Sequence, residues 1–529
     1  MNARTVRIFY VLHKWTGLIA GFALFVAFYA GALTMFHGDI ERWQRSFEPE
    51  APQQSLADAQ TLLDLVLSRH PELADGTVTV NLPSEHAPLA EAYFNTQAGF
   101  QHATLDELKQ AGPDGLPPHT PHSELAEFIN ELHYALGIPL VGGYLMGVIS
   151  LIYGLALVSG VLIHLPRLSR DVLALRVGGN LKLFWQDAHN LVGVVSLPFH
   201  IVFAWTGAVL GLGLVVLLAV DALGFQGRLM PELPRMLGVM PPSAQTQVEQ
   251  ARLLPLEALL TKSRTAVADK LGPAAGEGLF EPVRVRIQHP GKADAIAEVR
   301  GQVPGALGGS GAVAISAVSG QVIDVQVSGA RDANHGTLQV FYDLHFGHFG
   351  GPLLTWLYAL MGMAGAFLFY SGNLLFIEAR RKHGSVHQTP LARGMARATV
   401  GVCLGACVGM AAAFLATPWL SQASHAGSAV DVAFWERAIC FLAWAVSVVL
   451  ALVLSPVRAA EHLLWWTALL SALAMFSQLL LADASGPSGL VVNLVLGGLA
   501  LGAGGLAWRS RVRGREGRAD SVWALRQAG

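Results

Sequence analysis

Long apolar segments alternate with polar stretches along most of the chain. Eight of these segments are long enough to cross a bilayer, because about 20 apolar residues in a helix span its hydrocarbon core. They lie near residues 15–37, 140–164, 190–220, 352–377, 398–417, 434–456, 462–482 and 488–508. Charged residues, Pro or Gly bound each segment. The pattern predicts a mainly α-helical membrane protein with eight transmembrane helices.

The basic residues indicate how these helices are oriented. Arg4, Arg7 and Lys14 precede the first segment, and no small-x-small cleavage pattern follows it, so we expect an uncleaved helix. The short loops after the second, fourth and sixth segments carry Arg or Lys, whereas those near 418–432 and 483–487 carry neither. The positive-inside rule then predicts a multi-pass protein of a bacterial inner membrane with both termini in the cytoplasm.

Two polar insertions would lie in the periplasm, and each is large enough for a small domain. Each begins with a helical pattern, at 56–66 and at 256–271, and continues with strand-like alternation. We therefore predict two small α+β modules. The expected organisation is a first transmembrane helix at 8–39, module one at 40–132, helices two and three at 133–221, module two at 222–344, helix four at 345–380, C-terminal helices five to eight at 398–508, and a cytoplasmic tail at 509–529.

Composition excludes several classes of protein. The 529 residues are 53% hydrophobic and 14% charged, which excludes a soluble protein, and the net charge of −2 gives no support for a nucleic-acid partner. The three cysteines fall within apolar segments, so we interpret them as buried structural residues. The Gly-rich residues 305–313 lack the strand–turn–helix setting of a dinucleotide site and are interpreted as a loop.

An internal repeat relates the first four apolar segments. The residues that coincide after a shift of 176 positions are His13 and His189, Gly17 and Gly193, and Gly31 and Gly207. After a shift of 212 positions they are His133 and His345, Ser159 and Ser371, and Gly160 and Gly372. The four segments thus form two tandem helix pairs, which implies a pseudo-twofold axis along the membrane normal.

This repeat places four histidines at two depths. His13 and His189 enter at the cytoplasmic ends of their helices, whereas His133 and His345 lie just before helices that start at the periplasmic face. Haem iron takes axial ligands on both sides of the porphyrin, so the pairs His13/His189 and His133/His345 predict about two b-type haems per chain. Small residues let helices leave room for a haem. The glycines expected beside it are Gly17, Gly31, Gly193 and Gly207.

His200 is harder to assign. It follows His189 by 11 residues on nearly the same helix face, about 16 Å deeper. It could ligate a haem in place of a repeat partner. Its own repeat equivalent is Leu24, which favours a packed polar residue or a neighbour of a haem propionate.

The remaining histidines are weaker candidates. His37 and His164 end the first and second helices and have no histidine counterpart, so they resemble interfacial residues that anchor head groups or cap helices. His348 closely follows His345 and could replace it or act at a substrate entrance. Two histidines in the later helices, His425 and His462, are interpreted as structural.

These motifs resemble the PepSY-associated transmembrane family, whose members include bacterial inner-membrane ferric-siderophore reductases. The motifs are LHKWTG at 12–17, DAHNLVG at 187–193 and DLHFGHFGG at 343–351. The resemblance covers about residues 8–380. It implies PepSY-like periplasmic modules, b haems held by the four repeat histidines, and reduction of Fe(III)-siderophore in the periplasm. Helices five to eight depart from the shorter four-helix members.

The sequence therefore predicts a metalloreductase that passes electrons across the membrane and releases Fe(II) for iron uptake. The donor would be a separate molecule, either membrane quinol or a reductase, and no acid–base catalytic residue is assigned. Alternatives are a haem b electron-transfer subunit of a quinone-linked system, a haem-free siderophore or peptide transporter, and a membrane-anchored PepSY binding protein. The helices lack the midplane charged pairs of a transporter, and a simple anchor leaves the histidine symmetry unexplained.

Overall fold

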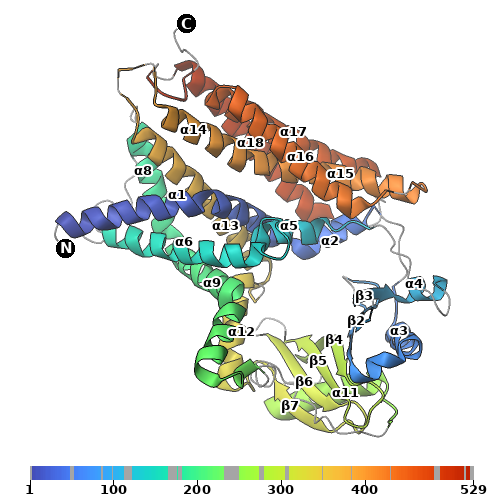
Figure 1. The fold of residues 1–529 in the computed structure, drawn as a ribbon. Helices are drawn as coiled ribbons and strands as arrows, with labels where there is room; N and C mark the ends of the chain where they lie inside the picture. The colour runs from blue at the N-terminus through green and yellow to red at the C-terminus, as the bar shows by residue number, and fades with distance from the viewer. Residues whose placement is uncertain are drawn as a thin grey trace. The chain divides into compact units, whose positions relative to one another are not determined.

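In the computed structural model, long apolar helices overlap the predicted transmembrane segments (Figure 1). The structure describes residues 3–47, 53–84, 87–97, 99–111, 122–164, 176, 181–230, 250–272, 279–303, 309–347, 349–382, 384–385, 387–428, 430–481, 489–516 and 520–524. Among these residues, eight helices are long and apolar enough to cross a membrane. The prediction of a mainly helical, multi-pass membrane protein is confirmed.

Four of these spans correspond to the repeat. Their helices are α1 (Ala3–Thr34), α6 (Gly142–His164), α9 (Leu197–Val220) and α13 (Gly351–Glu378). Small residues let them approach closely. A Cβ built on Gly211 of α9 would lie 2.6 Å from the Cα of Gly147 in α6, and one on Gly362 of α13 would lie 3.0 Å from the Cβ of Ala32 in α1.

The third predicted segment is divided in two. Helix α8 (Leu181–Val195) ends one residue before Ser196, and α9 begins one residue after it. Pro198 lies in the first turn of α9. Residues there have no carbonyl partner within the helix, so the N–H group that proline lacks is not needed. His189 and His200 therefore belong to two successive helices, whereas the sequence pattern predicted one.

Five further helices follow α13. They are α14 (Pro390–Ala398), α15 (Gly405–His425), α16 (Val432–Val453), α17 (Pro456–Leu481) and α18 (Leu490–Glu516), and a π-helical segment (Thr399–Leu404) joins α14 to α15. After α18, Asp520 binds the loop that follows α13. Its backbone carbonyl accepts from Arg381 Nε at 3.0 Å, and its carboxylate accepts from the Gly384 N–H at 2.9 Å.

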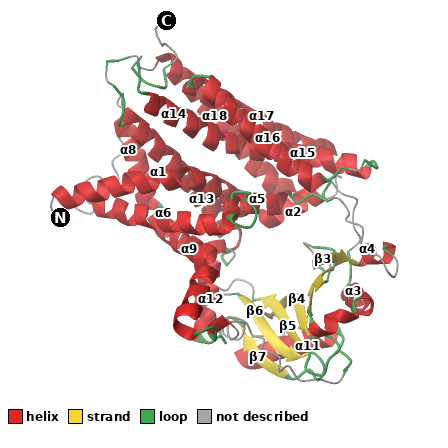
Figure 2. Cartoon of the chain, in the orientation of Figure 1, coloured by secondary structure: helices red, strands yellow, loops and turns green. Residues whose placement is uncertain are grey.

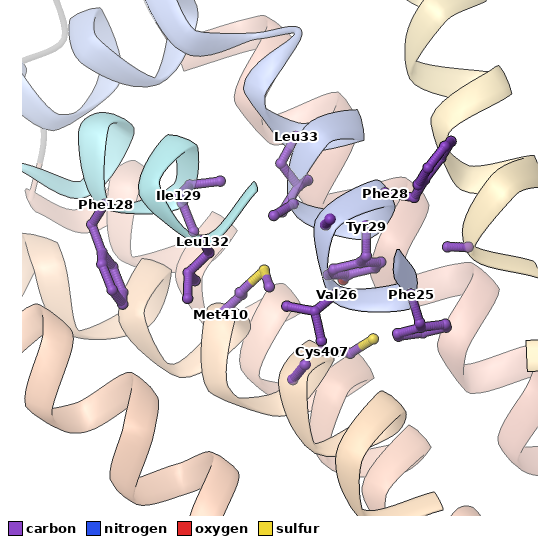
Figure 3. Close-up of a cluster of buried hydrophobic side chains, with 14 of the residues drawn as sticks. Phe25, Val26, Phe28, Tyr29, Leu33, Phe128, Ile129, Leu132, Cys407 and Met410 are labelled. Atoms are coloured by element: carbon purple, nitrogen blue, oxygen red, sulfur yellow. The ribbon is translucent and has the colours of Figure 1, made fainter. Parts of the chain in front are cut away.

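Two short helices within the first polar insertion pack with the transmembrane helices. They are α2 (His37–Arg45) and α5 (Leu125–Ala135). Figure 3 shows Leu132 and Ile129 of α5 near Tyr29 of α1 and Met410 of α15. All four belong to one buried apolar cluster, although Tyr29 and Met410 lie hundreds of positions apart. Helix α5 is thus held against both the repeat helices and the C-terminal helices.

The strands of the two polar insertions form one sheet (Figure 2). They are β1 (Thr77–Asn81), β2 (Glu91–Thr96), β3 (Gly99–Thr104), β4 (Glu281–Gln288), β5 (Ile296–Gln302), β6 (Ser310–Ser316) and β7 (Val322–Gln326). The order is β3-β2-β1-β4-β5-β6-β7, and every neighbouring pair is antiparallel. Strands β1 and β4 join the two insertions, with Val78 opposite Ile287 and Val80 opposite Val285.

Helices α3 (Leu56–Arg69) and α11 (Leu256–Leu271) cover one face of this sheet. Leu62 and Leu259, one from each helix, share a buried cluster with Val80 and Val285. The predicted α+β content is confirmed, but the sequence did not predict that both insertions would contribute to one sheet. A short helix α4 (Leu105–Gln110) follows β3, and α12 (Ala333–Phe346) precedes α13.

The chain divides into two compact units. One consists of residues 1–49, 121–214 and 355–529, and the other of residues 50–120 and 215–354. Helices α2 and α5 therefore belong to the membrane unit, although they lie within the first polar insertion. His345, near the end of α12, belongs to the sheet-containing unit.

Candidate functional site

His13 and His189 meet inside the membrane unit. The centres of their imidazole rings lie 6.3 Å apart, and the ring planes are inclined by 79°. Imidazole nitrogens bind transition metals at about 2.0–2.1 Å, so two imidazoles on one ion place their ring centres roughly 6 Å apart. The separation therefore fits two axial ligands of one iron. The repeat predicted this pairing from sequence positions alone.

The Nδ1 atom of His13 is bound by a neighbouring helix. It lies 2.8 Å from the backbone carbonyl of Ala156 in α6. A carbonyl only accepts, so Nδ1 carries the proton and the lone pair is on Nε2. Gly160 lies one turn further along α6, and a Cβ there would lie 3.1 Å from the His13 ring. Histidines that bind a metal through one ring nitrogen usually donate the other ring N–H to a carbonyl or carboxylate in this way.

His189 has an equivalent environment on α13. Its Nδ1 lies 3.0 Å from Ser371 Oγ, and that hydroxyl donates to the Leu368 carbonyl at 2.9 Å. The hydroxyl oxygen therefore accepts from the His189 Nδ1–H. A Cβ on Gly372 would lie 3.5 Å from the ring. Ser371 and Gly372 are the repeat equivalents of Ser159 and Gly160, so the internal repeat extends to the surroundings of the histidines.

His133 of α5 repeats the arrangement on α1. Its Nδ1 lies 2.8 Å from the carbonyl of Ala27, and a Cβ on Gly31, one turn later, would lie 2.6 Å from that nitrogen. Burial lowers the pKa of His133, so the imidazole is neutral at pH 7, as a metal ligand must be. His345 lies in the other unit, and its pairing with His133 stays a prediction.

The predicted glycines have different surroundings. Gly31 leaves space for His133, whereas no described atom lies within 4 Å of a Cβ built on Gly17. A Cβ on Gly193 would lie 3.4 Å from Leu368, and one on Gly207 would lie 2.7 Å from Ser150 Oγ. The glycines beside His13 and His189 are instead Gly160 and Gly372, which the sequence indicated only as markers of the repeat.

The weaker histidine candidates differ from one another in their surroundings. His37 begins α2, with Nε2 3.6 Å from Glu127 and Nδ1 3.9 Å from Glu41. Glu127 raises the pKa of His37, which favours an ion pair over metal ligation. His164 is the last residue of α6. His348 lies outside the described residues.

Asp187, in the middle of α8, binds Arg176, which precedes that helix in the sequence. Its carboxylate accepts hydrogen bonds from the Arg176 backbone N–H at 2.9 Å, from Nε at 2.9 Å and from Nη2 at 2.7 Å. Arg176 lowers the pKa of Asp187, so the carboxylate stays charged at neutral pH. This pair fixes the chain two residues before His189.

A buried polar cluster at α16 was missed in the sequence. Glu436 Oε1 accepts from Ser123 Oγ at 2.6 Å and from Thr417 Oγ1 at 2.7 Å, and Oε2 accepts from the Glu124 N–H at 3.1 Å. The next residue, Arg437, bonds Glu124 at 3.2 Å and also Glu131. The sequence signal that could have indicated this cluster is the adjacent pair of opposite charges, Glu436 and Arg437, within an apolar segment. This cluster ties the C-terminal helices to α5, which carries His133.

A comparison with known proteins identifies the family. The model of the PepSY-associated TM region matches residues 10–379. The uncharacterized protein PA4219 of Pseudomonas aeruginosa is 26% identical over 175 residues, which are 33% of this chain and 41% of that protein. The match thus spans less than half the length of this relative. Residues 10–379 contain every histidine assigned above, and the chain belongs to the PepSY-associated TM family.

Proposed function

We propose that the protein is a di-haem b-type inner-membrane reductase that reduces periplasmic ferric siderophore and releases Fe(II). One observation carries the proposal. His13, His133 and His189 each donate Nδ1–H to an oxygen of another helix, which directs the Nε2 lone pair away from that helix. Histidines with a purely structural role would not need to share this hydrogen bond from Nδ1 to another helix. Three of them at repeat positions fit iron ligation.

The repeat histidines would serve two haems. His13 and His189 would hold one haem toward the predicted cytoplasmic side, and His133 would supply a ligand to the second haem. His345 is its expected partner from the sequence repeat alone. Bound there, haem b supplies one-electron transfer. The carbonyls of Ala156 and Ala27 keep two of these imidazoles in the tautomer that binds iron. Within the described residues no cluster of three or more His, Cys, Asp or Glu side chains could hold a metal ion, and a bis-His haem needs only two protein ligands.

The face of the sheet opposite α3 and α11, where β2, β1 and β4 form it, is the proposed docking surface for an anionic chelate. Tyr93, Thr79 and Arg286 stand opposite one another across β2, β1 and β4, so their side chains share this face. Arg286 is exposed, and the Tyr93 ring lies 4.9 Å from that of His102. Arginine and aromatic side chains together suit a negatively charged ferric complex. Glu298 stands opposite Arg286 on the same face, but its carboxylate is paired with Arg300. A hard-oxygen chelate holds Fe(II) far less tightly than Fe(III), so reduction releases the metal.

The proposal is tested by electron transfer without other proteins. Detergent-purified protein is reduced with a stoichiometric amount of dithionite and mixed with ferric tris-catecholate in a stopped-flow spectrometer, with an Fe(II)-specific dye present. We expect the haem bands to oxidise as Fe(II) appears. The His462→Ala variant, altered at a histidine outside the repeat, should react like the wild type. Reduced haem that is oxidised by a quinone analogue but not by the ferric chelate would instead identify an electron-transfer subunit.

A further inference from the structure

His200 is a buried histidine with one unpaired nitrogen. Its side chain in α9 is fully buried, at 0% exposure. Nδ1 contacts the hydroxyl of Tyr153 in α6, whereas Nε2 has no hydrogen-bond partner among the described residues. A buried polar atom without a partner loses its hydrogen bonds to water and gains none in return, so native proteins rarely leave one unpaired.

Aromatic rings surround this histidine. The rings of Phe28 and Tyr153 lie 5.7 Å and 5.9 Å from the His200 ring. Phe203 and Phe369 in turn lie 5.9 Å and 5.2 Å from Phe28. None of the three phenylalanine side chains offers an acceptor for an N–H group. The apolar surroundings therefore make the unpaired nitrogen more costly.

The internal repeat shows that this polar pair is not needed for helix packing. Under the same two shifts, His200 corresponds to Leu24 and Tyr153 corresponds to Gly365. In that half of the repeat, the Phe28 ring fills the space beside Gly365, where a Cβ would lie 2.2 Å from Phe28 Cδ1. An apolar solution thus exists for one half of the bundle. The other half carries a buried hydroxyl and an imidazole instead, which indicates a bound group.

We propose that His200 is a positioning residue whose Nε2–H donates a hydrogen bond to a propionate carboxylate of haem. This inference rests on the proposed function. When the Tyr153 hydroxyl donates to Nδ1, the ring proton is on Nε2, which then requires an acceptor. The two propionate carboxylates are the strong acceptors that haem b carries. Tyr153 fixes the tautomer, and His200 makes the contact.

The test compares two variants with a matched control. His200→Leu introduces the residue found at the repeat position, Tyr153→Phe removes only the hydroxyl, and Tyr29→Phe removes a buried hydroxyl that contacts Cys407 instead. The measurements are haem content, the midpoint potential of each haem and the propionate-bending bands in resonance Raman spectra.

We expect the His200→Leu variant to keep the wild-type haem content and a low-spin bis-His spectrum. A propionate that loses its donor regains negative charge, which favours ferric iron, so the midpoint potential of one haem should become more negative. The propionate band should shift as well. Tyr153→Phe should change both in the same direction by less, and Tyr29→Phe should change neither.

Two results would overturn the inference and leave the proposed function standing. Loss of one haem in His200→Leu would make His200 an axial ligand. Unchanged potentials and propionate bands in both the His200→Leu and Tyr153→Phe variants would make the pair a packing feature. Absence of haem from the wild-type protein would instead refute the proposed function, and this inference with it.

Discussion

The repeat helices and the C-terminal helices are built from similar apolar sequence, and hydroxyl groups in both donate to carbonyls of their own helix. The repeat region differs because it also holds three imidazole rings against other helices. In the C-terminal helices, hydroxyl groups donate to the carbonyl four residues earlier in the same helix. These are Ser447 to Ala443, Thr467 to Leu463 and Ser477 to Leu473, at 2.7–2.9 Å. His13 of α1, His133 of α5 and His189 of α8 instead bind an oxygen of a different helix. A polar side chain that stays within its helix is compatible with simple packing, whereas one held by a neighbouring helix has its orientation fixed.

The C-terminal helices also have a structural role. Their one fully buried carboxylate among the described residues, Glu436, binds the start of α5 rather than its own helix. Helix α5 carries His133. The added helices therefore brace a candidate ligand that the repeat helices contact through Ala27.

Removal of a repeat histidine should have the largest effect. His13→Ala or His189→Ala should lose about one haem per chain, because an iron with a single axial imidazole is held weakly. The haem assigned to His133 should remain. Pyridine haemochrome spectra of each purified variant give the ratio, with His462→Ala as the control from the C-terminal helices. Retention of both haems in either variant would contradict the assignment of His13 and His189 as ligands of one haem.

Alanine at the three glycines beside histidines should give graded effects. Overpacking in a tight site typically costs 1–3 kcal/mol. A Cβ would lie 2.6 Å from the ring at Gly31, 3.1 Å at Gly160 and 3.5 Å at Gly372, so haem loss should decrease in that order. Gly17→Ala, where no described atom lies within 4 Å, is the control. Equal haem content in all four variants would show that close packing of the rings is unimportant.

Glu436→Ala should destabilise the membrane unit without removing a ligand. It leaves the Ser123 hydroxyl and the Glu124 backbone N–H without their acceptor, at a cost of about 1–3 kcal/mol. The Thr417 hydroxyl can still donate to the Ala413 carbonyl. Glu436→Gln retains an acceptor oxygen and should lose less. Thermal unfolding in detergent measures both variants. A Glu436→Ala protein as stable as the wild type would show that the brace is dispensable.

The smallest expected effect is the pH dependence of the α2–α5 contact. Glu127 raises the pKa of His37, and His37 lowers the pKa of Glu127. The pair is therefore strongest while both groups are charged, and its contribution is lost as pH rises through the raised pKa of His37. Both side chains are partly exposed, so the contribution is below about 1 kcal/mol. The melting-temperature difference between wild type and Glu127→Gln should shrink between about pH 5.5 and pH 8.5. A constant difference would show that the pair does not contribute.

Sequence reasoning predicted the elements better than their partners. The eight membrane helices followed from apolar length, and the closeness of the His13 and His189 rings followed from the repeat, because both patterns are local or periodic. Their ligation of a haem stays a prediction. The pairing of β1 with β4 could not be predicted, since two distant insertions carry no shared periodic signal. The carbonyls of Ala156 and Ala27 were also invisible, because a backbone acceptor has no side-chain identity. Glu436 was overlooked since one carboxylate hardly changes the hydropathy of its segment.

The most direct test of the account is the haem-to-protein ratio of detergent-purified protein from haem-replete cells, measured with reduced-minus-oxidised optical spectra. The account predicts about two b-type haems per chain with six-coordinate, low-spin bands, because the repeat predicts two pairs of histidine ligands, one pair for each iron. Protein that is folded by circular dichroism but carries no haem would contradict it, and would favour a transporter or a membrane-anchored binding protein.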